Sequence, residues 1–212
     1  MPLNGYLGVF QQVFTWLMRL TYLNMLWLGF TLIGGIVFGF FPSTAALFSV
    51  LRQCLREGPE SGGVQPFWEF YRREFFRSQK IGLSLFLAGY ILYVDLQLFA
   101  SGENFLSMVF QWIAIGFIFV YGIVLVFVFP VFVHLEGTVI QLLKNSLVFA
   151  VSHWAYAFII AAGWVMIAVI LIFLPALLFL IGGSLYALWS TWVFQKIWER
   201  LEFRKGMVRS EA

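Results

Sequence analysis

The feature that most constrains this chain is a run of 29 residues without a charged side chain, from Phe105 to Val133. A helix needs about 20 predominantly apolar residues to cross the hydrocarbon core of a bilayer, so this run is long enough to span it. The chain of 212 residues is 62% hydrophobic and 11% charged, whereas soluble domains carry about 25% charged residues. We therefore expect an all-α membrane protein in which residues 1–212 form a single membrane domain.

Four further apolar stretches have the composition of membrane spans. The first stops at Pro42 and lacks the positive segment and cleavage site of a signal peptide. The last two come from about forty apolar residues that we divide near Pro175, because so long a stretch exceeds one crossing. The predicted fold is a polytopic helical protein with five transmembrane helices, over residues 20–41, 81–100, 105–133, 155–174 and 176–194.

Two amphipathic cytoplasmic or interfacial helices are expected between the first two spans, over residues 43–57 and 66–80. Ser43 is a candidate N-cap for the first helix, and Gly58-Pro59 ends it. Both helices have a polar, basic face opposite an apolar face, which suits the headgroup layer of a membrane. The other interpretation is a docking surface for a partner, with Arg52, Arg56, Arg72 and Arg73 as the docking residues.

The distribution of Lys and Arg predicts how the spans are oriented. With the N-terminus outside and the C-terminus in the cytoplasm, twelve of the thirteen basic residues fall on the cytoplasmic side. The exception is Arg19, just before the first span. The formal net charge of +3 is then an asymmetry that faces anionic lipid. The expected partner is therefore the lipid bilayer, and no nucleic acid is expected.

Arg19 also has a possible partner in Asp95, which lies five residues before the outer end of the second predicted span. A carboxylate inside a membrane is costly unless it is paired, hydrated or protonated. The long stem of an arginine can reach down a helix to meet such a group. We expect an Arg19–Asp95 ion pair between the first two spans; the alternatives are hydrogen bonding of Asp95 to nearby polar groups and a proton or cation relay.

Motifs for catalysis and for cofactor or metal binding are not found in the sequence. It contains no G-x-x-x-x-G-K-[ST] phosphate-binding loop and no G-x-G-x-x-G motif after a strand. Its two histidines, His134 and His153, lack the spacing of a zinc site, and Cys54 is the one cysteine. We expect no enzyme activity, no cofactor and no metal. Gly35-x-x-x-Gly39 allows close helix approach, and we favour packing within the chain over a dimer face.

The most specific motifs of the chain are an N-x-x-W motif at Asn24 and Trp27 and a G-x-x-P-x-T-A-A motif over residues 39–46. With these motifs the chain resembles the YesL family of small bacterial integral membrane proteins. The aromatic residues of 67–75 and the stretch Lys144-Asn145-Ser146 extend the resemblance over nearly the whole chain. The resemblance implies a five-span helical protein of the bacterial cell membrane and no established activity.

Genes of that family commonly lie among those for carbohydrate importers of the ATP-binding-cassette (ABC) type. The resemblance therefore implies an accessory or regulatory membrane subunit of such an importer, with its permease subunits as possible partners. The alternatives are a self-sufficient channel or transporter for a small solute, and a membrane assembly factor. A channel would need a polar path through the spans, and Asp95 is the one ionisable residue clearly inside a predicted span.

Overall fold

In the computed structural model, residues 3–100, 102 and 104–210 are described, and they are almost entirely helical. No strand occurs within those ranges. A short 3-10 turn spans Pro59–Ser61, and a π-helical segment, η2, spans Leu178–Gly182. The α-helices are α1 (Leu3–Ile33), α2 (Val37–Glu57), α3 (Val64–Ala100), α4 (Phe105–His134), α5 (Val139–Ser152), α6 (Trp154–Phe173), α7 (Pro175–Leu177) and α8 (Gly183–Ser210).

Four segments of the described chain are long and apolar enough to cross a membrane. They are Val64–Ala100, Phe105–His134, Trp154–Phe173 and Pro175–Arg200. These segments correspond to the second to fifth predicted spans, to within one residue at the end of the fourth, with the predicted division at Pro175. The prediction of a polytopic helical membrane protein is therefore confirmed.

The first predicted span, residues 20–41, does not fold as one helix. Helix α1 ends at Ile33 and α2 begins at Val37. Between them Gly35 and Ile36 have φ angles of 74° and 61°, in the left-handed region that interrupts a right-handed helix. Trp27 of α1 contacts Thr44 of α2, so the two helices run back along each other as a hairpin.

Two other predicted boundaries also differ from the structure. Ser43 does not cap a helix, because it is buried inside α2 directly after Pro42. The predicted helices over residues 66–80 and 81–100 are one continuous helix of 37 residues, α3. Pro66 lies in its first turn, where proline is tolerated, and no later residue breaks the helix. At 1.5 Å per residue α3 is about 55 Å long, well beyond the roughly 30 Å of hydrocarbon.

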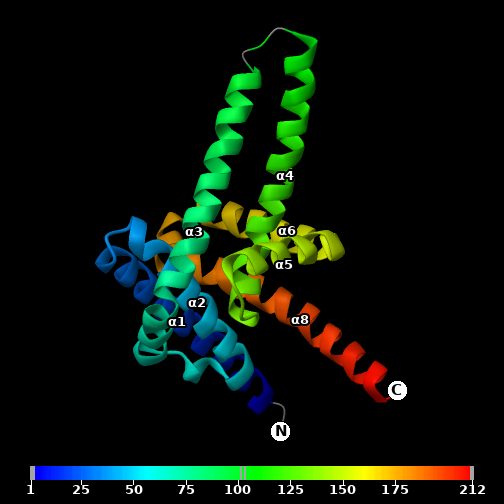
Figure 1. Ribbon diagram of the computed structural model, residues 1–212. Coiled ribbons are helices and arrows are strands. Elements are labelled where there is room, and N and C mark those ends of the chain that lie inside the picture. The colour runs from blue at the N-terminus through cyan, green and yellow to red at the C-terminus, as the bar shows by residue number, and fades with distance from the viewer. Residues whose placement is uncertain (1–2, 101, 103, 211–212) are drawn as a thin grey trace.

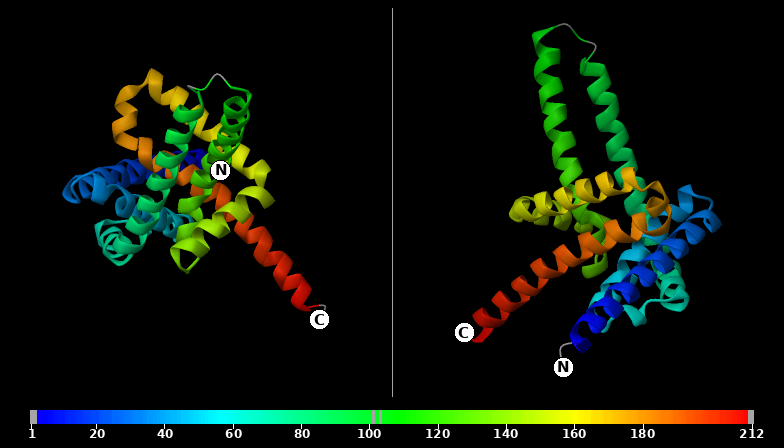
Figure 2. Two further views of the ribbon diagram at one scale, coloured as in Figure 1. Left: turned by 45° about the horizontal axis from the view of Figure 1, so that its top comes forward. Right: turned by 180° about the vertical axis from the view of Figure 1, so that it is seen from behind.

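The α3–α4 hairpin stands out from a wider base formed by the other helices, and both termini lie at the base, away from its tip (Figure 1). The reverse view shows the same separation, with α6 crossing near the lower part of the hairpin (Figure 2). Buried apolar side chains collect in the base in two clusters. One is centred on Phe127, Ile160 and Phe194, and the other includes Leu23 and Leu51.

Candidate functional site

A polar cavity of about 360 Å³ lies where α2, the first half of α3 and the link between α4 and α5 meet. We call it the arginine pocket. The uncharged part of its lining includes Ser49, Phe70 and Phe132. Its charged residues are Arg52, Arg73, Glu74, Arg77 and Glu136.

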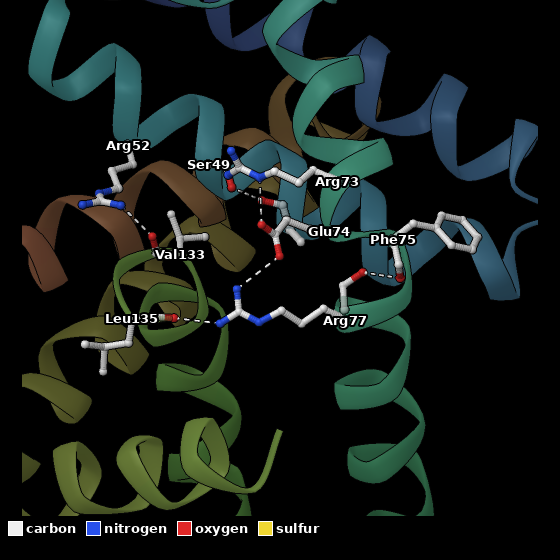
Figure 3. A network of polar contacts seen from close by, with 10 residues as sticks. Ser49, Arg52, Arg73, Glu74, Phe75, Arg77, Val133 and Leu135 are labelled. Atoms are coloured by element: carbon white, nitrogen blue, oxygen red, sulfur yellow. Dashed lines mark hydrogen bonds and ion pairs between the residues drawn. The ribbon is translucent and has the colours of Figure 1, made fainter. Parts of the chain in front are cut away.

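Two arginines attach the α4–α5 link to the helices beside it. Arg52 of α2 donates from Nη1 to the carbonyl oxygen of Val133 at 2.6 Å. Arg77 of α3 donates from Nη2 to the carbonyl oxygen of Leu135 at 2.9 Å (Figure 3). The last carbonyls of a helix have no partner within that helix and carry partial negative charge. The two guanidinium groups satisfy such carbonyls at the end of α4.

Glu74 lies between the guanidinium groups of Arg73 and Arg77. Its Oε1 accepts from Nε of Arg73 at 3.0 Å, and its Oε2 accepts from Nη1 of Arg77 at 3.2 Å (Figure 3). The Glu74 side chain is 13% exposed and that of Arg73 is 60% exposed. A single carboxylate therefore orients two of the arginines that line the pocket.

Aromatic rings pack against the guanidinium groups of the same two arginines. The guanidinium carbon of Arg77 lies 4.7 Å from the ring centroid of buried Phe132, and that of Arg73 lies 5.0 Å from the Phe70 ring. Such cation–π contacts fix the plane of a guanidinium group. Nε of Arg77 is buried and makes no hydrogen bond within the described residues.

The four predicted docking residues separate into two pairs in the structure. Arg52 and Arg73 line the arginine pocket, whereas Arg56 and Arg72 are exposed and do not line it. Arg77 is a central residue of the pocket that the sequence prediction omitted. Its spacing of four residues from Arg73 places both on one helix face, which is the signal that would have identified it.

The structure does not bring Arg19 and Asp95 together. Arg19 of α1 donates to the carbonyl oxygen of Gly62, in the loop before α3. Asp95 lies 31 residues beyond Val64 on the same continuous helix α3, which is about 46 Å at 1.5 Å per residue. The structure therefore does not contain the predicted Arg19–Asp95 ion pair. The prediction assumed a single helix over residues 20–41, and that helix is interrupted.

The N-x-x-W motif makes structural contacts. Asn24 is fully buried; its Nδ2 donates to the carbonyl oxygen of Phe179 at 2.6 Å, and its Oδ1 accepts from the backbone nitrogen of Ser184 at 3.0 Å. These two backbone groups flank the end of the π-helical segment, where regular α-helical bonding is interrupted. Trp27 donates to the hydroxyl of Thr44 at 3.1 Å. The motif joins α1 to α2 and α8.

Close backbone approach occurs at the α1–α2 turn, within the chain. A Cβ atom on Gly34 would lie 2.7 Å from the hydroxyl of Tyr71, and one on Gly39 would lie 2.9 Å from the Phe30 carbonyl. A Cβ on Gly35 would meet nothing within 4 Å. Gly39 therefore packs internally, but against the end of α1 rather than as part of a pair with Gly35.

Comparison with known proteins places these features in a family. The family model described as "Protein of unknown function, DUF624" matches residues 20–96, a range that contains the arginines of the pocket and the N-x-x-W motif. The chain is 32% identical to the uncharacterised protein YesL of Bacillus subtilis (strain 168), over 90% of this chain and 90% of that protein.

Two other proteins of the same organism, both described as uncharacterised, are similar as well. YteU is 36% identical over 82% of this chain and 78% of its own length. YesV is 30% identical over 80% of this chain and 82% of its own length. No solved structure matches the chain. With relatives of this similarity over most of its length, the chain belongs to the YesL family.

Proposed function

We propose that this protein is an accessory integral membrane subunit that assembles with the permease subunits of a carbohydrate importer of the ABC type. It has no catalytic activity of its own in this proposal. The partner class comes from the genes that commonly lie beside those of the YesL family. The observation that carries an assembly role is the uncovered α3–α4 hairpin.

The chain itself covers little of this hairpin. Within an apolar stretch of 18 residues, 6% is buried in α3 and 17% in α4. In the segment Pro175–Arg200, 44% of such a stretch is buried. The hairpin also stands apart from the base in Figure 1 and in the reverse view of Figure 2. Its apolar surface is therefore available to lipid or to the transmembrane helices of another chain.

Asp95 favours a protein neighbour over lipid alone. It lies five residues before the end of α3 and is partly exposed. Within the described residues, the side-chain carboxylate of Asp95 forms no ion pair or hydrogen bond. A carboxylate on an apolar hairpin needs a donor or a counter-charge, and polar contacts between transmembrane helices supply such groups. A permease helix with a basic or hydroxyl side chain would fit this surface.

A self-sufficient channel has less support, because the cavity along the spans is apolar. A cavity of about 350 Å³ beside α4 and α6 is lined only by apolar side chains and glycine, including Phe119, Val126 and Phe158. An ion or sugar crossing the membrane would need polar groups along its path. The arginine pocket does not provide such a path, since it lies at the end of α4.

We also propose a bacterial cell membrane location, with the hairpin tip outside and the C-terminus in the cytoplasm. For the N-terminus we propose the cytoplasmic side, unlike the orientation expected from the sequence. Arg19 contacts Gly62, so the middle of α1 lies near the α2–α3 loop. All thirteen basic residues of the chain then fall on the cytoplasmic side, as the positive-inside bias favours.

Labelling single cysteines with an impermeant reagent on intact cells tests this orientation. In a Cys54→Ser background, Asn104→Cys should react without permeabilisation, while Arg72→Cys and Gln12→Cys should react only after it. Reaction of Gln12→Cys on intact cells would restore the N-terminus outside, and reaction of Arg72→Cys would overturn the whole orientation.

Purification of the tagged protein from its native membranes in mild detergent tests the assembly role. Importer permease subunits should co-purify, and Asp95→Leu should reduce their recovery several-fold while the protein remains inserted. Gln97→Leu, an exposed polar residue near Asp95 on the same hairpin, is the matched control. Absence of permease subunits would refute the assignment, and a purified protein that moves solute into liposomes would support the channel alternative.

A further inference from the structure

The arginine pocket contains more positive charge and more hydrogen-bond donors than its internal contacts use. Its lining has three arginines and two glutamates. Arg73 gives its Nε to Glu74, and no hydrogen bond occupies its Nη groups within the part of the chain that is described. Nε of Arg77 is buried without an acceptor. These donors have no acceptor among the described residues and are available to a bound anion.

The arrangement of the two guanidinium groups suits a tetrahedral oxyanion. Glu74 orients both Arg73 and Arg77, one through each of its carboxylate oxygens (Figure 3), and the rings of Phe70 and Phe132 pack against the two guanidinium groups. Arginine binds phosphate through paired N–H groups, with added strength where water is partly excluded. Donors held in place before binding also lose less entropy when the anion binds.

The position of the pocket fits the boundary of a membrane. Helix α4 ends at His134, and the link that follows it forms one wall of the pocket. Helix α3 is too long for the hydrocarbon core, so its first turns lie outside it. Basic pockets between spans at this level bind the phosphate of lipid headgroups. The volume of about 360 Å³ is within the range of small-ligand sites.

We propose that the arginine pocket binds a phosphate group, with Arg73 and Arg77 as its donors. The group belongs either to the headgroup of an anionic glycerophospholipid or to a free phosphate compound. This site is separate from the hairpin surface around Asp95, so it does not depend on the proposed partner. It adds a ligand to the proposed function, and loss of either property leaves the other measurable.

The experiment uses the full chain purified in non-ionic detergent. Native mass spectrometry measures retention of added phosphatidylglycerol against phosphatidylcholine, and thermal unfolding measures the response to sodium phosphate against sodium chloride at equal ionic strength. Arg73→Gln should weaken phosphate-group binding about ten-fold, since a charged hydrogen bond is lost. Arg72→Gln is the matched control, because Arg72 is the exposed neighbour outside the pocket and should change binding less than about two-fold.

The two sources of phosphate give different results. Selective retention of phosphatidylglycerol that Arg73→Gln removes identifies a lipid site. Stabilisation by sodium phosphate that Arg73→Gln removes, without selectivity between the lipids, identifies a site for a soluble compound. An equal loss of ligand binding in Arg72→Gln and Arg73→Gln would show only general charge attraction and would overturn the proposal. Absence of binding of both phosphatidylglycerol and phosphate would also overturn it. Circular dichroism of both variants confirms that they remain folded.

Discussion

The α1–α2 hairpin and the α3–α4 hairpin are both pairs of long helices, but they have different surroundings. Helix α2 buries eleven of its residues, including Ala45, Ala46 and Val50, against the rest of the chain. Most of the α3–α4 hairpin is uncovered. At the α1–α2 turn Gly34 and Gly39 lie against backbone and side chains, whereas Gly116 and Gly122 of α4 have open space around them.

This difference shows what holds helices together where lipid competes for apolar surface. Lipid tails are as apolar as leucine, so hydrophobicity alone does not favour one helix over the bilayer as a neighbour. The α1–α2 hairpin packs through small residues and through polar contacts such as those of Asn24 and Trp27. Outside its base, the α3–α4 hairpin has fewer such contacts, which leaves its surface for lipid or a partner.

The largest expected effect is at Gly39, because its new side chain would meet backbone. In Gly39→Ala the Cβ would overlap the carbonyl of Thr31 and crowd that of Phe30, so α1 and α2 must separate. We expect a loss of about 3 kcal/mol, or about 10 °C in the midpoint of thermal unfolding in detergent. Gly116→Ala on the uncovered hairpin should shift the midpoint by about 1 °C or less. Similar shifts in both variants would contradict the contrast between the hairpins.

A smaller loss is expected when the polar link between α1 and α8 is removed. Asn24→Leu deletes the two hydrogen bonds of the buried side-chain amide to the carbonyl of Phe179 and the backbone nitrogen of Ser184. We expect a loss of about 2 kcal/mol, measured by thermal unfolding. Gln97→Leu, at an exposed site on α3, should change stability by less than about 0.5 kcal/mol. If Asn24→Leu were equally mild, the link would be dispensable.

The smallest effect concerns the buried thiol of α2. Burial raises the pKa of Cys54 above its usual value of 9.0, although the nearby Ser61 and Arg19 oppose the shift. Because the folded thiol holds its proton more tightly, its contribution to stability is fully present below about pH 9 and is lost as the pH rises further. Maleimide labelling at pH 8 should be at least about ten-fold slower than at Asn104→Cys in Cys54→Ser. Equal labelling rates would show that the α2–α3 loop opens readily.

Much of the fold was predictable because hydropathy and length determine which segments cross a membrane. The predicted span over residues 105–133 matches α4 closely, and Pro175 marks the division between the last two. The break at Gly35 and Ile36 was missed because apolar residues continue through it, and the Gly34-Gly35 pair was not interpreted as a turn. The continuity of α3 was missed for the opposite reason: a change from basic to apolar residues was interpreted as a helix boundary.

The candidate site was predicted only in part. Arg52 and Arg73 were identified from their positions on amphipathic helices, and both line the arginine pocket. Arg52 is not part of a flat docking face, because it donates a hydrogen bond to the carbonyl of Val133, 81 residues away in the sequence. Contacts between segments so distant in the sequence leave no periodic signal. The same limitation produced the mistaken pairing of Arg19 with Asp95.

The contacts of Asn24 have a consequence for biosynthesis. Asn24 leaves the ribosome early, yet its partners Phe179 and Ser184 lie 155 and 160 residues later in the chain. Until the last span is inserted, the amide of Asn24 has neither of these backbone partners. A chain truncated before η2 would therefore leave the side-chain amide of Asn24 without either of these partners. The N-terminal helix therefore reaches its final packing only after the C-terminal span has been made.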